Sequence, residues 1–309
     1  MKDCVRLILI MAAILSLVEV SFAEEIDGIK AESETVTSEP SKAGYVDVGG
    51  LNMYYEIYGE GEPLVLLHGA FSTIDLNFGK LMPSLARDRQ VIGIEQQGHG
   101  HTEDIDRPFS YEQMGNDTAR LLRQLGIKKA DILGYSDGGI IALELAIRHP
   151  EAVRKLVIIS SPYKRDGWYP EGYAFIENLT PEMFNGSGAP EAYARVAPNP
   201  ANWTALIEKD KRLGLEYIGR TTEEFRSIKA PTLIIIGDSD GVRPESAVEM
   251  FRLLGGGVFG DIAGLPNSEL AVLPGTSHIG IMMERTDWLV PMIQFKSLSI
   301  IIGSTSSPE

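Results

Sequence analysis

Cysteine and positive charge are both scarce in this 309-residue chain. Cys4 is the only cysteine, so no disulfide can form within the chain and stability has to come from the packed core. There are 28 Lys and Arg residues against 43 Asp and Glu, which gives a formal net charge of −15. Because no excess of basic residues is available to neutralise phosphates, we expect neither nucleic acid nor an anionic membrane surface as a partner.

Long apolar runs are also missing. The run from Leu7 to Val18 is shorter than the roughly 20 residues that a membrane-spanning helix needs. Lys2 and Arg6 precede it, and Ser21-Phe22-Ala23 provides the small residues after which signal peptidases cut. We therefore expect residues 1–23 to be an export signal and the mature protein to be periplasmic or extracellular, without stable membrane insertion. A membrane-anchoring helix is the alternative.

Metal-ligand spacing and internal repeats are absent from the sequence as well, so we expect no metal and no cofactor. With 44% apolar and 23% charged residues, the chain has the composition of an ordinary globular protein. Its length fits one large domain with an insertion. Residues 24–43 are rich in Glu, Ser, Thr and Lys and predict a disordered linker, and the small polar residues of 297–309 predict a frayed tail.

The hydrophobic pattern predicts an α/β fold for residues 44–162 and 230–296. Residues 44–48 and 51–58, joined at Gly49-Gly50, predict a β-hairpin. Short runs that are apolar at every position predict parallel strands covered on both faces, and helical patterns alternate with them. The predicted strands are 64–67, 91–94, 132–133, 156–159, 233–236 and 270–273, and the predicted helices are 78–87, 111–125, 140–149, 244–254 and 281–296, the last bent at Pro291.

The alternation stops between residues 163 and 229. This segment is rich in proline and in aromatic residues, which is too apolar a composition for a flexible loop. We expect a small helical cap over the strand ends. Its aromatic residues would be divided between the cap's own packing and the wall of a pocket, where Trp168 of the cap and Phe71 of the core are candidate substrate contacts. The alternative is that all of these aromatic residues belong to the cap's own core.

The segment Gly134-Tyr135-Ser136-Asp137-Gly138-Gly139 lies between an apolar strand and a helical pattern. A Gly-x-Ser-x-Gly in this setting forms a turn so tight that Ser136 takes a strained backbone conformation, and Gly134 and Gly138 leave no room for a β-carbon. The helix that follows directs free N–H groups at the same position. The pattern predicts a nucleophilic serine, with a glycine-rich turn and a capping serine as the alternative.

A serine nucleophile needs a base and the base needs an acid. Of the five histidines, only His278 follows the last predicted strand, so it is the base by elimination. His68 and His99 are expected to brace loops through hydrogen bonds, and His101 and His149 to lie at the surface. Two carboxylates follow the strand at 233–236, Asp238 and Asp240, and either could be the acid.

Taken together, the chain resembles the α/β-hydrolases over about residues 44–296. The resemblance rests on the serine motif, on the order Ser, Asp, His along the chain, and on four further motifs: His68-Gly69-Ala70-Phe71, Gln97-Gly98-His99-Gly100-His101-Thr102, Gly237-x-x-Asp240 and Pro274-Gly275-x-x-His278. It implies that Asp240 is the acid. It also implies an oxyanion hole made by the backbone N–H groups of Ala70 and Asp137. Glu95-Gln96-Gln97 departs from the Asp that many family members have, and we expect only a changed loop hydrogen bond from it.

The elbow Ser136-Asp137-Gly138-Gly139 is similar to that of valacyclovir-hydrolase-like esterases, which implies that Asp137 receives the ammonium of an amino-acid ester. The simpler interpretation is that Asp137 interacts with the helix dipole. We expect a cofactor-free serine hydrolase that cleaves a small carboxylic ester. Lactonase, carbon–carbon hydrolase or perhydrolase chemistry and a non-catalytic ligand-binding relative remain alternatives, because fold does not choose among them. Haloalkane dehalogenases and epoxide hydrolases are disfavoured, since they carry an aspartate where Ser136 stands.

Overall fold

The computed structural model describes residues 39–295. The predicted export signal (1–23), the predicted tail (297–309) and most of the predicted linker (24–43) lie outside the described residues. The last residues of that linker are ordered instead, since the first strand begins at Lys42, where it pairs with Ile57. A polar composition is compatible with this strand because it lies at the edge of the sheet and most of its side chains are exposed.

Within residues 39–295, the sheet has eight strands in the order β1-β2-β4-β3-β5-β6-β7-β8. The first two strands form the predicted hairpin, β2 pairs antiparallel with β4, and all other neighbours are parallel. The predicted α/β architecture is therefore confirmed. The strands are β1 (Lys42–Asp47), β2 (Asn52–Tyr58), β3 (Glu62–Leu67), β4 (Arg89–Ile94), β5 (Ala130–Tyr135), β6 (Val153–Ile159), β7 (Thr232–Ser239) and β8 (Ser268–Ser277).

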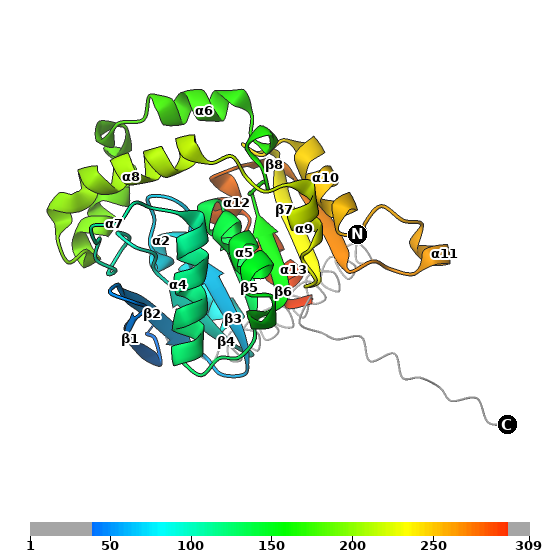
Figure 1. The fold of residues 1–309 in the computed structure, drawn as a ribbon, viewed down its shortest axis with the longest axis horizontal. Helices are drawn as coiled ribbons and strands as arrows, with labels where there is room; N and C mark the ends of the chain where they lie inside the picture. Colours follow the sequence, from blue (N-terminus) through cyan, green and yellow to red (C-terminus); the bar gives the residue numbers. More distant parts are fainter. Residues whose placement is uncertain (1–38, 296–309) are drawn as a thin grey trace, which may run out of the picture. The chain divides into compact units, whose positions relative to one another are not determined.

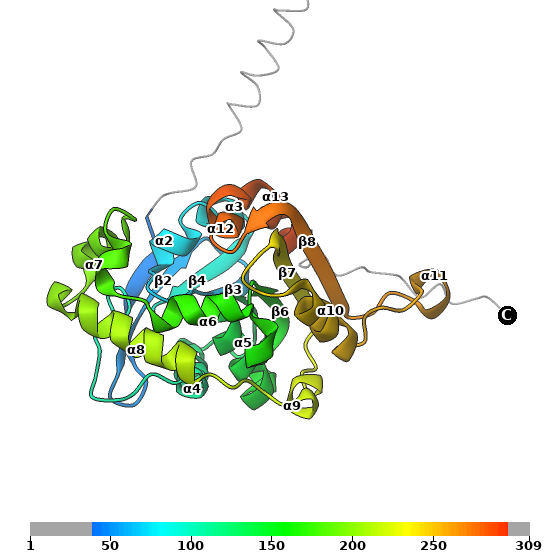
Figure 2. The same cartoon turned by 90° about the horizontal axis from the view of Figure 1, so that it is seen from above.

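Helices cover both faces of this sheet (Figures 1 and 2). On one face lie α4 (Tyr111–Gln124), α5 (Asp137–Arg148) and α10 (Pro244–Leu253), and on the other lie α3 (Met82–Leu85), α12 (Gly280–Glu284) and α13 (Thr286–Phe295). Shorter elements are α2 (Ile74–Phe78), which contacts α12, the 3₁₀ turn η1 (Pro150–Ala152), and α11 (Gly260–Ala263). None of the helices in the described part of the chain is long and apolar enough to cross a membrane.

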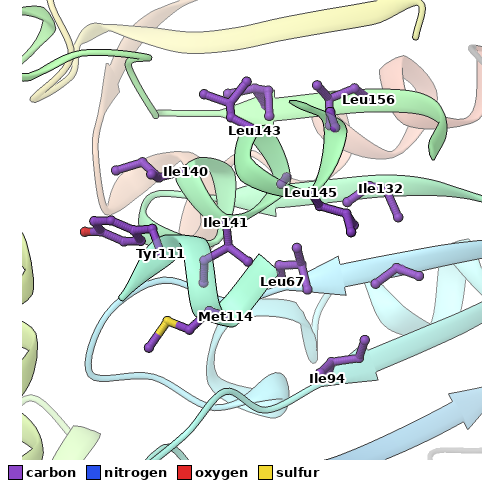
Figure 3. Close-up of a cluster of buried hydrophobic side chains, with 14 of the residues drawn as sticks. Leu67, Ile94, Tyr111, Met114, Ile132, Ile140, Ile141, Leu143, Leu145 and Leu156 are labelled. Carbon is purple, nitrogen blue, oxygen red and sulfur yellow. The ribbon is translucent and has the colours of Figure 1, made fainter. Parts of the chain in front are cut away.

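The core between α4, α5 and the central strands explains why those strands are apolar at every position. Figure 3 shows Met114 of α4, Ile141 of α5, Leu67 of β3 and Ile132 of β5 in one cluster, and all four side chains are almost completely buried. Burial of each such side chain contributes about 1.5–3 kcal/mol. This packing holds the start of α5, and with it Ser136, against the ends of β3 and β5.

Two predicted helices are each divided in the structure. The segment predicted as one helix at 78–87 contains the end of α2 and the separate α3, because Gly79 closes α2 and Pro83 lies in the first turn of α3. The segment predicted at 281–296 is divided between α12 and α13 at Arg285, whose backbone is not helical. Pro291 lies inside α13. At both places the predicted helix continues past a residue, Gly79 or Arg285, at which the helix in the structure ends.

Residues 163–229 form a helical segment, as predicted. Its elements are η2 (Arg165–Gly167), α6 (Pro170–Glu177), η3 (Pro181–Phe184), α7 (Ala189–Val196), η4 (Pro200–Asn202), α8 (Trp203–Glu216) and α9 (Thr222–Arg226). Four of them begin with a proline in the first turn, where its missing N–H costs nothing. The aromatic residues are divided: Phe184 and Tyr193 pack on Trp203 within the cap, whereas Trp168 contacts His278 of the core.

Candidate active site

Ser136 occupies the turn between β5 and α5. Its φ of +52° is rarely adopted by a residue with a side chain. The two flanking glycines are required by contact: a Cβ on Gly134 would lie 2.1 Å from the carbonyl oxygen of Gly138, and a Cβ on Gly138 would lie 2.0 Å from that of Leu67. The turn thus has the strained form that the sequence predicted, and it presents the Ser136 hydroxyl beyond the end of β5.

This crowding gives a stability prediction. Gly138→Ala should destabilise the protein by more than about 2 kcal/mol, because backbone atoms rather than a flexible side chain occupy the space of the new methyl group. Gly172→Ala is the matched control, since a Cβ there meets nothing within 4 Å and Gly172 lies in helix α6. That control should be neutral or slightly stabilising. Thermal unfolding of the two variants measures the difference, and equal melting temperatures would contradict the crowding.

The structure brings Ser136, His278 and Asp240 together. Each of them follows directly on a strand, namely β5, β8 and β7. The Nε2 atom of His278 lies 3.0 Å from the Ser136 Oγ atom, and the Nδ1 atom of His278 lies 2.8 Å from Asp240 Oδ1. Since a carboxylate can only accept, Nδ1 carries the proton and the neutral ring has Nε2 free to accept from the hydroxyl.

Asp240 is buried, and both of its carboxylate oxygens accept hydrogen bonds. Its Oδ1 accepts from the Val242 N–H in addition to His278, and its Oδ2 accepts from the Ser160 hydroxyl and the Gly237 N–H. Burial opposes ionisation, but the hydrogen bonds from His278, Ser160 and Val242 outweigh it and hold the pKa of Asp240 below its usual value. Asp240 is therefore ionised at neutral pH.

Asp238, the other carboxylate that the sequence left open, does not reach His278. It is exposed and accepts from the backbone N–H groups of Gly275 and Thr276, which fixes the turn before His278. Those hydrogen bonds lower the pKa of Asp238. Ser160, by contrast, was missed by the sequence analysis. The signals available for it were its place directly after β6 and its φ of +54°, of which only the first can be read from the sequence.

Two aromatic residues contact His278. The ring of Trp168 meets it edge-on with centroids 5.5 Å apart, and the Tyr135 hydroxyl donates to the His278 carbonyl oxygen at 3.0 Å. Trp168 belongs to the cap, so the cap contributes to the surroundings of the candidate base. The role of Trp168 and Phe71 as substrate contacts stays a prediction.

His68 and His99 form the loop hydrogen bonds that we expected. His68 accepts from the Gln96 N–H through Nε2 and donates to the Gly69 carbonyl through Nδ1, and burial lowers the pKa of His68 to about 4, so this ring is neutral. The two ring nitrogens of His99 face acceptors, the Gln97 carbonyl and the Asp210 carboxylate, so both donate. Burial alone would lower the pKa of His99, but the pairing with Asp210 raises it. His99 is therefore a cation.

The surface position predicted for His101 and His149 is correct only in part, since their side chains are 29% and 21% exposed. His101 stacks on Tyr54 and bonds to Glu95, and His149 bonds to Asn116 of α4. Both found partners on elements distant in sequence, which a local pattern does not reveal. The Glu95 carboxylate accepts from the ring Nδ1 and from the backbone N–H of His101. The Glu that stands here in place of the family's Asp therefore forms hydrogen bonds within its own loop.

Ala70 and Asp137, the predicted oxyanion-hole donors, lie on neighbouring segments. The loop after β3 passes close to Ser136, because a Cβ on Gly69 would lie 3.1 Å from the Ser136 Cβ. Asp137 is the first residue of α5, so its N–H is one of the free donors of that helix. Both amides thus lie at the edge of the sheet where the Ser136 hydroxyl is presented.

A small cavity of about 10 Å³ lies beside Ala70, which is about the room that one water molecule needs. Two carboxylates line it, Asp137 of α5 and Asp210 of the cap helix α8. Burial and the nearby Asp210 carboxylate raise the pKa of Asp137 to about 7, although a hydrogen bond from Tyr111 opposes the shift. Asp210 was missed by the sequence analysis, because the cap contains no motif that singles it out.

Within residues 39–295, no three His, Cys, Asp or Glu side chains gather in a way that could hold a metal ion.

Comparison with known proteins bears on the fold and on the class of the protein. Residues 62–185 match the family described as the alpha/beta hydrolase fold. A putative carbamate hydrolase, RutD of Azorhizobium caulinodans, is 29% identical over 222 residues, which cover 65% of this chain and 82% of that protein. The human serine hydrolase BPHL is 29% identical over 207 residues, which cover 64% of this chain and 70% of BPHL.

Among solved structures, a meta-cleavage product hydrolase from Pseudomonas fluorescens superimposes with a TM-score of 0.67 at 22% identity, over 84% of this chain and 99% of that one. At this identity the likeness shows the fold alone. Together with the family match over residues 62–185 and the similar hydrolases, it leads to one conclusion: the chain has the α/β-hydrolase fold and is a hydrolase.

Proposed function

We propose that this protein is a serine hydrolase that cleaves a small carboxylic ester through an acyl-enzyme. The proposal rests on one observation: the Ser136 hydroxyl, held at a φ of +52°, lies 3.0 Å from a His278 whose other nitrogen faces the buried Asp240. Nucleophilic catalysis needs a base in contact with the hydroxyl and an acid that fixes the tautomer of that base, and this arrangement provides both.

In the proposed reaction, the Ser136 oxygen attacks the ester carbonyl carbon while its proton moves to His278 Nε2. The N–H groups of Ala70 and Asp137 stabilise the oxyanion that forms. The carbon–oxygen bond to the alcohol then breaks, and His278 returns the proton to the leaving alcohol. Water, deprotonated by His278, attacks the acyl-enzyme, and the acid leaves as Ser136 recovers its proton. Asp240 keeps the charge of the imidazolium balanced throughout.

Release of p-nitrophenol from short p-nitrophenyl esters tests this function. A panel that also contains lactones, amides and carbamates then separates ester hydrolysis from the other reactions open to the same residues. Absence of turnover on the whole panel, with binding of the esters retained, would favour the alternative of a non-catalytic ligand-binding relative.

A narrower proposal concerns the acyl group, which we propose carries an ammonium. The cavity beside Ala70 is lined by the carboxylates of Asp137 and Asp210, and among residues 39–295 the only basic side chains that line it are the neutral His68 and the cationic His99. Two carboxylates facing one cation favour a second positive charge nearby. The pKa of Asp137 is raised because Asp137 is buried close to a second carboxylate, and a bound ammonium would stabilise its ionised form.

Asp137→Ala should therefore lower kcat/KM for an alanine p-nitrophenyl ester by about 10-fold or more and leave p-nitrophenyl propionate nearly unchanged. The two substrates differ only in the amino group, so propionate is the matched control. In the wild type, the preference for the amino ester should rise as Asp137 ionises near pH 7 and fall as the ammonium loses its proton near pH 8. Equal losses on both esters would contradict the assignment.

A further inference from the structure

Asp210 connects the cap to the loop that carries the candidate oxyanion-hole donor. It lies on the cap helix α8, and its side chain is 1% exposed. Its Oδ2 atom accepts from the backbone N–H of Phe71 at 3.0 Å and contacts His99 Nε2 at 2.9 Å. Its other oxygen has no hydrogen-bond partner in the part of the chain that the structure describes, and Asp210 lines the cavity beside Ala70. Burying a carboxylate costs free energy unless it is paired and hydrogen-bonded, so the contacts of Asp210 with the core have to offset that cost.

The Ala70 amide lies between two amides that side chains hold. On one side, the Gly69 N–H donates to Asn77 Oδ1 at 2.8 Å. On the other side, the Phe71 N–H donates to Asp210. Both acceptors are buried, so water does not compete for these hydrogen bonds. The peptide that presents the Ala70 N–H is thereby restrained at both ends.

Phe71 also carries backbone strain. Its φ of +55° is in the left-handed region, which costs a residue with a side chain on the order of 1–3 kcal/mol. Such a conformation persists only where surrounding contacts impose it. The charge-assisted hydrogen bond to Asp210 and the packing of the Phe71 ring on Phe184, with centroids 5.0 Å apart, are two such contacts, and both come from the cap.

We propose that Asp210 is a positioning residue for the oxyanion hole: it holds the Phe71 amide from the cap helix and so orients the neighbouring Ala70 N–H toward the reacting carbonyl oxygen. This inference rests on the proposed function. It means that the hole is fully formed only when α8 is packed on the core. Cap packing and transition-state stabilisation are thus coupled through one carboxylate.

Asp210→Ala tests the coupling. An oxyanion donor acts on the transition state and not on the bound ester, so kcat per active site for p-nitrophenyl propionate, which carries no ammonium, should fall by about 10²-fold while its KM changes by less than about threefold. The affinity for phenylboronic acid, which forms a tetrahedral adduct with a serine hydroxyl, should fall in proportion to kcat/KM. Active sites are counted by fluorophosphonate labelling carried to completion, so that loss of folded protein does not enter kcat.

Lys209→Gln is the matched control on the same helix. Lys209 also joins the cap to the core, through Asp104 at 2.6 Å and the carbonyls of Ile105 and Arg107, but it does not touch the loop after β3. Its loss should lower the melting temperature and leave kcat per active site within about twofold of the wild type. Asp210→Asn should recover much of the rate, because its amide oxygen can still accept from the Phe71 N–H.

A purely structural role for Asp210 predicts a different result. The Asp210→Ala variant would then melt earlier and contain fewer active sites, but kcat per site and boronate affinity would match the wild type, and this result would overturn the proposal. If Asp210→Ala yields no folded protein, Asp210→Glu decides, because it keeps the charge near His99 and displaces the acceptor. Its kcat and boronate affinity should both fall at least about 10-fold, and unchanged values would overturn the proposal. A Ser136→Ala variant that kept a tenth of the wild-type turnover would instead contradict the proposed function itself.

Discussion

Ser136→Ala should lower kcat for p-nitrophenyl acetate by at least about 10⁴-fold, and KM should change little. The reason is that the hydroxyl is the group that the structure places in contact with His278, and no covalent acyl-enzyme can form without it. Residual turnover should come only from the oxyanion hole and from binding. Steady-state release of p-nitrophenol gives the rate, and a fluorophosphonate probe should label the wild type but not the variant.

Ser239→Ala is the control for this substitution. Ser239 directly precedes the candidate acid Asp240 and lies at the exposed end of β7, where its hydroxyl donates to Asp238. Its removal should leave the rate within about twofold of the wild type, as expected of a surface substitution. If Ser136→Ala kept a tenth of the wild-type rate, a serine other than Ser136, or a different mechanism, would have to account for the turnover.

Asp240→Asn should be the next largest loss, about 10⁴-fold in kcat. An asparagine amide in this place can donate to His278 Nδ1, which would favour the tautomer with its proton on Nε2, where it cannot accept from Ser136. The hydrogen bonds from the Gly237 N–H and the Ser160 hydroxyl to the remaining oxygen hold the side chain in place, so the effect should be on the rate more than on the fold.

Asp238→Asn separates the two carboxylates that the sequence left open. Asp238 accepts only from backbone N–H groups of the turn before His278 and from the neighbouring Ser239 among the described contacts, and Asn can keep one of these bonds. Its kcat should stay within about 10-fold of the wild type. Equal losses in the two variants would show that the turn before His278 matters as much as the carboxylate that contacts it.

The elements of the fold were predictable where the pattern was strong. The buried strands are apolar at every position because helices cover both of their faces, and this leaves a signal in the sequence itself. The pattern was weaker where one residue decides a boundary, as at Gly79 and Arg285, because the apolar periodicity continues across the break. Lys42 and Ala43 looked like linker, since an exposed edge strand has a polar composition.

The candidate site divides in a similar way. Ser136 and His278 were predictable because each follows a strand in a motif whose glycines have a local steric purpose. Ser160, Tyr111 and Asp210 were not, although all three contact the site or its acid. Each of them reaches its partner from a different element, and no local pattern marks a serine, a tyrosine or an aspartate for such a contact.

The sequence by itself determined the order of the strands and helices, the strained turn at Ser136 and the residues able to supply a nucleophile and a base, because these follow from periodicity and from steric limits between neighbours along the chain. The resemblance favoured Asp240 over Asp238 as the acid, but only the tertiary structure decided that Asp240 meets His278, and that Asp210 of the cap holds the loop beside Ser136. Hydrogen bonds extend over about 3 Å, so a carboxylate two residues away can point elsewhere, and one far along the chain can be the partner.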